Sequence, residues 1–252
     1  MARRHDPDRF LCALFAPSAR RESLFLLIAV NHELARAREV TSQPMLALIR
    51  LQWWREVAEG AVRHHEVAGP LAAALAAGEI LAADVLAMIE GRETEADEAI
   101  PSLDAWQGYV RATAGALAVA MARRLGADAA ALGRIEALGV AYGVAGQLRN
   151  VPAAASQGRC MLPLDLLQAH GLTAEMVVAR PDDPALRPVL AELAAWGRRL
   201  LGPRVAVPRP LIAAALPGVL ARRDLGRVGR APGPRGGGDK LAVAAAAAAC
   251  RV

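Results

Sequence analysis

Alanine content and the helical spacing of apolar residues most constrain the fold of this chain. Alanine supplies 58 of the 252 residues, and it is the residue that best stabilises a helix. Apolar side chains recur every three to four residues along most of the sequence, and strand-like alternation does not persist anywhere. The sequence therefore predicts an all-α protein, with its main helices in residues 1–225.

Proline and serine residues divide this region into a series of predicted helices. We expect helices at residues 19–38, 45–62, 70–77, 80–91, 103–125, 128–149, 164–170, 173–178, 185–201 and 211–222. A proline lacks the amide hydrogen and clashes with the preceding turn, so Pro152 predicts a loop over residues 151–163. In the Trp53-Trp54 pair we expect one core and one half-exposed ring.

The C-terminal part of the chain has a different charge and composition. Residues 193–252 carry 11 basic and 2 acidic residues, whereas residues 1–192 carry 19 and 23. The glycine- and proline-rich stretch 226–238 has no apolar period, so residues 226–252 are predicted to be a flexible basic tail. Within it, residues 240–252 could form a short helix or remain unordered.

Composition also narrows the possible functions. The three cysteines are far apart, which favours a reducing, cytoplasmic location, and the five histidines lack the spacing of a zinc site. We expect no signal peptide and no membrane-spanning helix. The basic tail suits an anionic partner such as a membrane surface, but residues 197–252 contain no aromatic side chain for stacking on bases. No specific nucleic-acid binding is therefore expected.

Several segments, in the right order, resemble the squalene/phytoene synthase family. They are DPDRFLCALFAPSARRESLFLLIAVNHELA (6–35), LIRLQWWREVAEG (48–60), MIEGRETE (88–95), YVRATAGALAVAMARRLG (109–126), GVAGQLRN (143–150) and GRCMLPLDLLQAHGLT (158–173). The resemblance covers about residues 6–225. It implies the all-α isoprenoid-synthase fold, a single helical bundle around a central cavity.

The resemblance also implies a chemistry that this chain departs from. The family joins two prenyl diphosphates, using Mg²⁺ held by two aspartate-rich helix motifs, because Mg²⁺ prefers carboxylate oxygens. The first motif falls here on Ala35, Arg36 and Glu39, and the second falls on residues 150–159, which contain no carboxylate. The resemblance is therefore closer to a catalytically degenerate branch, which includes assembly factors for respiratory complex I. Two sequence patterns match that branch: the segment NHELA (31–35), and Leu148-Arg149 followed three residues later by Pro152.

We therefore expect no catalytic residues, metal or other cofactor, with Mg²⁺ required only if the chain is an active head-to-head prenyl transferase. The predicted function is that of a non-catalytic helper, peripheral on the inner face of the membrane, whose partners are a membrane surface or a membrane-protein complex. A retained pocket could bind a prenyl lipid. Candidate binding residues, chosen as anion-binding arginines and polar groups near the motif positions, are Arg36, Glu39, Arg50, Gln147, Arg149, Asn150 and Arg159.

The helix predicted at residues 211–222 has two interpretations. Its apolar residues and the arginines at its end suit a segment lying in a membrane interface. The same pattern suits ordinary packing on the bundle, and the sequence does not separate the two.

Overall fold

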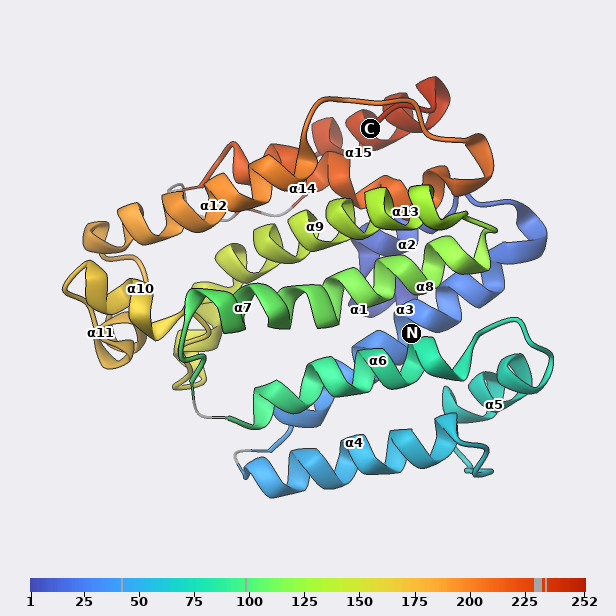
Figure 1. Cartoon of the computed structure of the whole chain (residues 1–252), viewed down its shortest axis with the longest axis horizontal. Helices are drawn as coiled ribbons and strands as arrows, with labels where there is room; N and C mark the ends of the chain where they lie inside the picture. The colour runs from blue at the N-terminus through green and yellow to red at the C-terminus, as the bar shows by residue number, and fades with distance from the viewer. Residues whose placement is uncertain (42, 98, 229–232, 234) are drawn as a thin grey trace.

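The computed structural model describes residues 1–252 except 42, 98, 229–232 and 234. The described residues form helices and no strands, with isolated β-bridges at Ile100–Pro163 and Ala206–Arg251 (Figure 1). The α-helices are α1 (Ala2–His5), α2 (Pro7–Ala13), α3 (Ser18–Glu39), α4 (Pro44–Ala58), α5 (Ala68–Ala76), α6 (Ala82–Glu93), α7 (Leu103–Val110), α8 (Ala116–Arg124), α9 (Ala129–Ser156), α10 (Leu164–Ala169), α11 (Ala174–Ala179), α12 (Arg187–Leu201), α13 (Ile212–Ala215), α14 (Pro217–Leu225) and α15 (Gly237–Ala249). The all-α prediction is confirmed.

Helix α9 lies at the centre of the bundle. Asp128 begins it by accepting a hydrogen bond from the Ala131 amide at 2.8 Å. Helices α8, α12, α13 and α14 pack against it, and glycines let two of them approach closely. A Cβ at Gly139 would collide with the Ala118 Cβ, and one at Gly197 would lie 3.0 Å from the Val144 Cγ1. Small side chains therefore set the spacing of the central helices.

The α3, α4 and α6 helices form the other side of the bundle. Leu24, Leu27 and Ile28 of α3 recur at helical spacing and are buried. Trp54 of α4 is buried whereas Trp53 is half-buried, and their rings meet edge to face at 4.9 Å between centroids. The prediction of one core tryptophan and one half-exposed tryptophan is confirmed.

The predicted end of the central helix at residue 149 is wrong. Helix α9 continues through Pro152 to Ser156. A proline removes only its own amide donor, and the amides after it still reach carbonyls of the preceding turn. The predicted 151–163 loop is correspondingly shorter.

Of the two alternatives left open for residues 240–252, the structure has the short helix. Helix α15 covers Gly237–Ala249 and packs on α14, with Asp239, Val243 and Val252 buried. Val252 pairs with Val205 through two backbone hydrogen bonds of 2.9 and 3.1 Å. Part of the predicted linker (229–232 and 234) lies outside the described residues. The described residues of this region are held on the bundle by ion pairs, which composition alone does not reveal.

The region predicted as a single helix over 211–222 is split into η4 (Arg209–Leu211), α13 and α14. Leu211, Ile212, Leu216 and Leu220 are all buried against the bundle. Packing therefore accounts for this apolar face, and the alternative that it lies in a membrane interface is wrong for these side chains. No helix in the described part of the chain combines the length and apolarity needed to cross a membrane.

Candidate functional site

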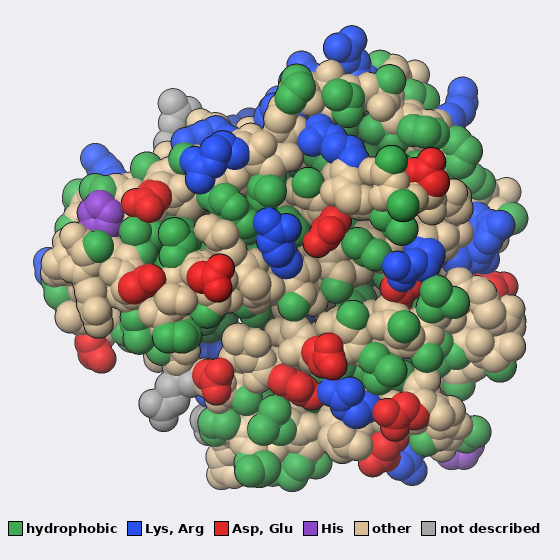
Figure 2. Space-filling model, in the orientation of Figure 1, with side chains coloured by type: hydrophobic (Ala, Val, Ile, Leu, Met, Phe, Trp, Pro, Cys, Tyr) green, Lys and Arg blue, Asp and Glu red, His purple; other side chains and the backbone are tan. Residues whose placement is uncertain are grey.

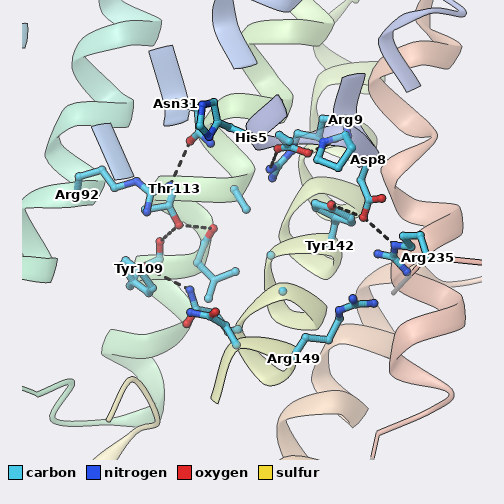
Figure 3. A pocket seen from close by; sticks show the side chains of 18 residues that line it. His5, Asp8, Arg9, Asn31, Arg92, Tyr109, Thr113, Tyr142, Arg149 and Arg235 are labelled. Carbon is cyan, nitrogen blue, oxygen red and sulfur yellow. Dashed lines mark hydrogen bonds and ion pairs between the residues drawn. The ribbon is translucent and has the colours of Figure 1, made fainter. Parts of the chain in front are cut away.

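A cavity of about 630 Å³ opens between the N-terminal segment and helices α3, α6, α7 and α9 (Figure 3). Its lining is mostly polar. The lining residues are His5, Asp6, Pro7, Asp8, Arg9, Asn31, Arg92, Tyr109, Val110, Thr113, Ala114, Tyr142, Gly143, Gly146, Gln147, Arg149, Asn150 and Arg235. The polar groups form two networks on opposite walls.

The first network centres on the buried Glu95 carboxylate. Its Oε1 accepts hydrogen bonds from Arg92 Nη1 and from the Tyr109 hydroxyl, each at 2.6 Å. Arg92 also donates to Asn31 Oδ1 at 3.2 Å, and Gln147 Nε2 donates to the Tyr109 oxygen at 3.3 Å. Burial and the neighbouring Glu95 raise the pKa of Tyr109, so its hydroxyl keeps its proton and remains a donor.

A π-helical segment, η2 (Arg111–Gly115), shapes this wall between α7 and α8. The Thr113 hydroxyl donates to the Tyr109 carbonyl at 2.8 Å, which satisfies an acceptor in the widened turn. Gly143 of α9 lies against the segment, and a Cβ there would be 2.5 Å from the Ala114 Cβ. The sequence analysis predicted one continuous α-helix over 103–125. No residue in that range signals the wider π-helical turn.

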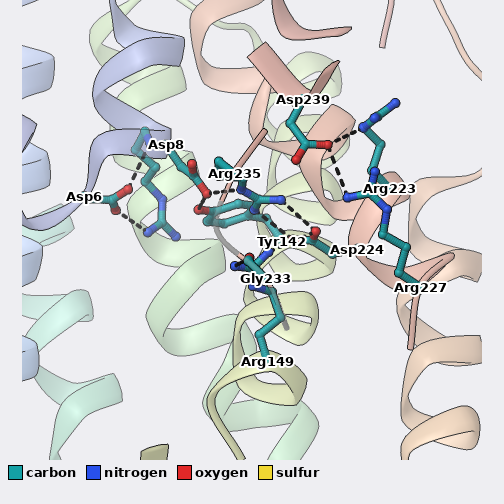
Figure 4. A network of polar contacts seen from close by, with 11 residues as sticks. Asp6, Asp8, Tyr142, Arg149, Arg223, Asp224, Arg227, Gly233, Arg235 and Asp239 are labelled. Carbon is teal, nitrogen blue, oxygen red and sulfur yellow. Dashed lines mark hydrogen bonds and ion pairs between the residues drawn. The ribbon is translucent and has the colours of Figure 1, made fainter. Parts of the chain in front are cut away.

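The second network joins both ends of the chain (Figure 4). Arg235 donates from Nε to Asp8 Oδ2 at 2.7 Å, and from its two terminal nitrogens to Asp224 at 2.6 and 2.8 Å. Arg149 Nη1 donates to the same Asp224 at 3.2 Å. Although burial alone would lower the pKa of Arg235, its hydrogen bonds to Asp224 and Asp8 raise it. Arg235 is therefore a permanent cation between two carboxylates.

Arg9 and Tyr142 complete this wall. The Asp6 carboxylate caps α2 by accepting from the Arg9 amide at 2.9 Å, and it pairs with the Arg9 guanidinium at 2.8 Å. The guanidinium carbon of Arg9 lies 4.6 Å from the centre of the Tyr142 ring, whose hydroxyl donates to Asp8 at 3.2 Å. Both carboxylates that line the described cavity, Asp6 and Asp8, are thus bound by arginines of the same chain.

The structure brings only some of the predicted binding residues to this cavity. Gln147, Arg149 and Asn150 line it, on consecutive turns of α9. Arg159 lies behind the first wall, where it donates to the Glu95 carbonyl at 3.2 Å.

The other three predicted residues lie outside the lining. Arg36 pairs with Glu33 at 3.3 Å, Glu39 is exposed at the end of α3, and Arg50 is exposed on α4.

Sequence reasoning missed Arg9, Tyr109, Tyr142 and Arg235. One available signal was that Tyr109 and Tyr142 are the only two tyrosines of a chain in which aromatic residues make up 4%. Nothing in the local sequence marked Arg235, because its two partners are 11 and 227 residues away.

The donor set does not fit a magnesium cluster. Mg²⁺ prefers several carboxylate and water oxygens in octahedral geometry. In the described ranges, no three His, Cys, Asp or Glu side chains are grouped so that they could hold a metal ion. Asp6 and Asp8 each face a guanidinium, which would compete with the ion and repel it.

Two solved structures share this helical architecture. A dehydrosqualene synthase in complex with ligand superposes with a TM-score of 0.80 over 98% of this chain and 93% of that chain, at 16% identity. The squalene synthase HpnC from Alicyclobacillus acidocaldarius superposes with a TM-score of 0.69 over 90% of this chain and 89% of that chain, at 19% identity. The protein therefore has the all-α isoprenoid-synthase fold, which is what likeness at these identities shows.

The chain belongs to the squalene/phytoene synthase family, whose sequence profile matches residues 2–241. The match extends into α15, beyond the range expected from the motifs. The human protein named NADH dehydrogenase (ubiquinone) complex I, assembly factor 6 is 28% identical over 204 residues. That alignment covers 77% of this chain and 60% of the human protein.

Proposed function

We propose that this protein is a non-catalytic member of its family that assists the assembly of a membrane-bound NADH dehydrogenase complex. Its place would be the cytoplasm, at the inner face of the membrane. The observation that carries the proposal is the pairing of both cavity-lining carboxylates, Asp6 and Asp8, with arginines of the same chain. The similarity to assembly factor 6 names the class of partner.

The pairing argues against the chemistry of prenyl transfer. Ionising an allylic diphosphate requires cations to neutralise the leaving group, and carboxylates must be free to hold them. Here Asp6 holds Arg9 at 2.8 Å and Asp8 holds Arg235 at 2.7 Å. The predicted motif positions add Glu39 alone, on the exposed end of α3. Assisting the assembly of another complex requires neither bound metal cations nor free carboxylates to hold them.

A deletion strain tests the assembly role. Membranes from cells lacking the gene should lose the intact NADH dehydrogenase band on native gels together with NADH:quinone oxidoreductase activity. Both should return with the wild-type gene and equally with Glu39→Gln, because the proposal assigns no metal-binding role to that carboxylate. A normal complex in the deletion strain would contradict the proposal.

The alternative is an active head-to-head prenyl transferase, and a cavity of about 630 Å³ next to Gln147 and Asn150 favours testing it. Calorimetry with a non-hydrolysable farnesyl diphosphate analogue separates the two functions. Binding that requires Mg²⁺ would support the transferase. Binding that is unaffected by a chelator would indicate a retained anion or prenyl-lipid pocket that uses Arg149, and the absence of binding would leave the helper role without a lipid ligand.

A further inference from the structure

One edge of the molecule carries arginines without acidic partners. We use the name arginine face for six side chains on this edge. Four of them are exposed and two are half-buried: Arg199, Arg204, Arg209 and Arg251, and Arg134 and Arg222, respectively. Among the described residues, none of the six has a carboxylate oxygen within 4.0 Å, whereas Arg223, Arg227 and Arg235 of the same C-terminal region do. This charge is therefore not neutralised within the described chain.

Backbone carbonyls hold the face together. Arg134 Nη2 donates to the Leu201 carbonyl at 2.7 Å, and Arg222 Nη2 lies 3.5 Å from the same oxygen and 3.0 Å from that of Gly202. Arg251 Nη2 donates to the Arg204 carbonyl at 3.3 Å. Burial, then Arg204 and Arg134, lower the pKa of Arg222, which indicates unrelieved repulsion between like charges. An anion at this face would relieve that repulsion.

The acidic residues of this region cannot supply that anion. Residues 193–252 contain 2 acidic residues, Asp224 and Asp239, and both are buried. Asp224 binds Arg235 and Arg149, and Asp239 binds Arg223 and Arg227. The inward carboxylates thus fasten the C-terminal segment and leave a basic outer surface.

Figure 2 shows the same asymmetry: basic side chains gather along the edge formed by α12 to α15, and acidic ones over α6 and α4. Within the arginine face, Val205 directly follows Arg204 and is 36% exposed. Arginines interspersed with exposed aliphatic side chains suit the interface of an anionic bilayer. Residues 197–252 offer no aromatic ring for bases to stack on, which disfavours nucleic acid.

We propose that the arginine face binds the anionic phospholipid headgroups of a membrane surface. The inference deepens the proposed function, on which it rests for the membrane as the setting, and it assigns the contact to α12, the loop after it and the C-terminus. It differs from the membrane contact that the sequence suggested, because the apolar residues of 211–222 are buried and cannot make it.

Vesicle flotation with the full-length protein tests the proposal. We expect binding to vesicles of phosphatidylcholine with phosphatidylglycerol, weak binding to phosphatidylcholine alone, and loss of binding at high salt. The variant Arg199→Glu/Arg204→Glu/Arg209→Glu leaves the carbonyl-binding Arg134 and Arg222 in place. It should lower the partition coefficient by at least about 100-fold, since each basic residue at the surface contributes roughly a factor of five.

A matched control changes the same charge elsewhere. Arg3, Arg4 and Arg20 are exposed, lie outside α12 to α15, and have no ion pair within the described part of the chain. The variant Arg3→Glu/Arg4→Glu/Arg20→Glu should therefore lower binding by less than about tenfold. Circular dichroism melts check that both triple variants fold, and Arg204→Gln serves as a milder variant.

Three outcomes would overturn the proposal. They are equal binding to neutral and anionic vesicles, equal losses in the two triple variants, and binding to random duplex DNA as tight as binding to anionic vesicles at the same salt. None of them bears on the deletion-strain experiment. A failure here is therefore distinguishable from a failure of the assembly role.

Discussion

At the scale of single residues, Arg235 connects parts of the chain that are distant in sequence. Its guanidinium joins Asp8 near the N-terminus to Asp224 on α14, and the Asp224 side chain is only 5% exposed. Removing one member of a buried ion pair leaves the other charge without compensation. Arg149 compensates Asp224 in part, at 3.2 Å.

We expect Arg235→Gln to lower the free energy of unfolding by about 3 kcal/mol, the lower end for a broken buried pair because Arg149 remains. Urea denaturation followed by circular dichroism measures this. Arg180→Gln is the control, since its pair with Asp183 is 69% exposed on the arginine side. That change should cost less than about 1 kcal/mol. Similar losses in both variants would contradict the structural role of Arg235.

A stacked histidine pair gives the N-terminal segment a pH dependence. The His5 and His32 rings lie 4.0 Å apart, and the His32 Nε2 is buried without a hydrogen-bond partner in the described structure. Burial, and then the neighbouring His5, lower the pKa of His32 below 6.5. The unfolded chain then binds the proton more tightly than the folded one.

Stability contributed by neutral His32 should therefore be present above pH 6.5 and decrease as the pH falls below that value. We expect the urea midpoint of the wild type to decrease between pH 7.5 and pH 5 more than that of His32→Phe, which keeps a stacking ring and cannot titrate. Parallel midpoint curves for the two proteins would show that His32 does not titrate differently on unfolding.

At the scale of elements, close packing between α9 and the π-helical η2 segment positions the cavity wall. A Cβ at Gly143 would meet the Ala114 Cβ at 2.5 Å and the Val110 Cγ1 at 2.8 Å. Tyr109 and Thr113, which line the cavity, belong to the same two turns. A change in helix separation would therefore move both the core and the candidate site.

We expect Gly143→Ala to lower the free energy of unfolding by about 1–3 kcal/mol, because overpacking forces the helices apart. Gly133→Ala on the same helix has no atom within 4 Å of the added Cβ. It should raise the free energy of unfolding by up to about 1 kcal/mol through better helix propensity. Thermal melts of the two variants give the comparison, and a stabilised Gly143→Ala would contradict the packing.

At the scale of the whole molecule, the C-terminal region is part of the bundle. A protein ending at Leu225 would lose Arg235, the buried Asp239 and Val243, and the strand-like pairing of Val205 with Val252. We expect this truncation to lower the free energy of unfolding by at least about 3 kcal/mol, through the broken ion pairs alone. A flexible tail would predict an unchanged melting temperature, so calorimetry of the truncated and full-length proteins decides between the two.

The helical class and most helix positions followed from sequence because they depend on local properties. Alanine content, the spacing of apolar residues and capping prolines act within a few residues, and each was readable without coordinates. The motifs indicated the family because each is a short run of neighbouring residues that can be recognised without coordinates. The exceptions, α9 running through Pro152 and the π-helical turn at η2, arise where neighbouring helices support a backbone that local propensity does not favour.

The candidate site was only partly predictable. Gln147, Arg149 and Asn150 share one helix, so their spacing placed them together. Arg36 and Arg50 were equally reasonable from sequence, but α3 and α4 carry them outside the cavity lining. With 29 arginines, composition cannot select those that face a cavity. The prediction of catalytic inactivity remains a prediction for the deletion strain and the binding assay.

The sequence by itself determined the all-α class, the family and the excess of positive charge after residue 193. Only the tertiary structure decided which charges are neutralised and which face solvent. The reason is that ion pairing depends on distance in space. Arg235 meets Asp8 across 227 residues. Arg204 and Arg209 are far nearer in sequence to Asp224 than Arg235 is to Asp8, yet they have no carboxylate within 4.0 Å in the described structure. Within one basic stretch of sequence, the fold therefore places some arginines in ion pairs with buried carboxylates and leaves others exposed as the arginine face.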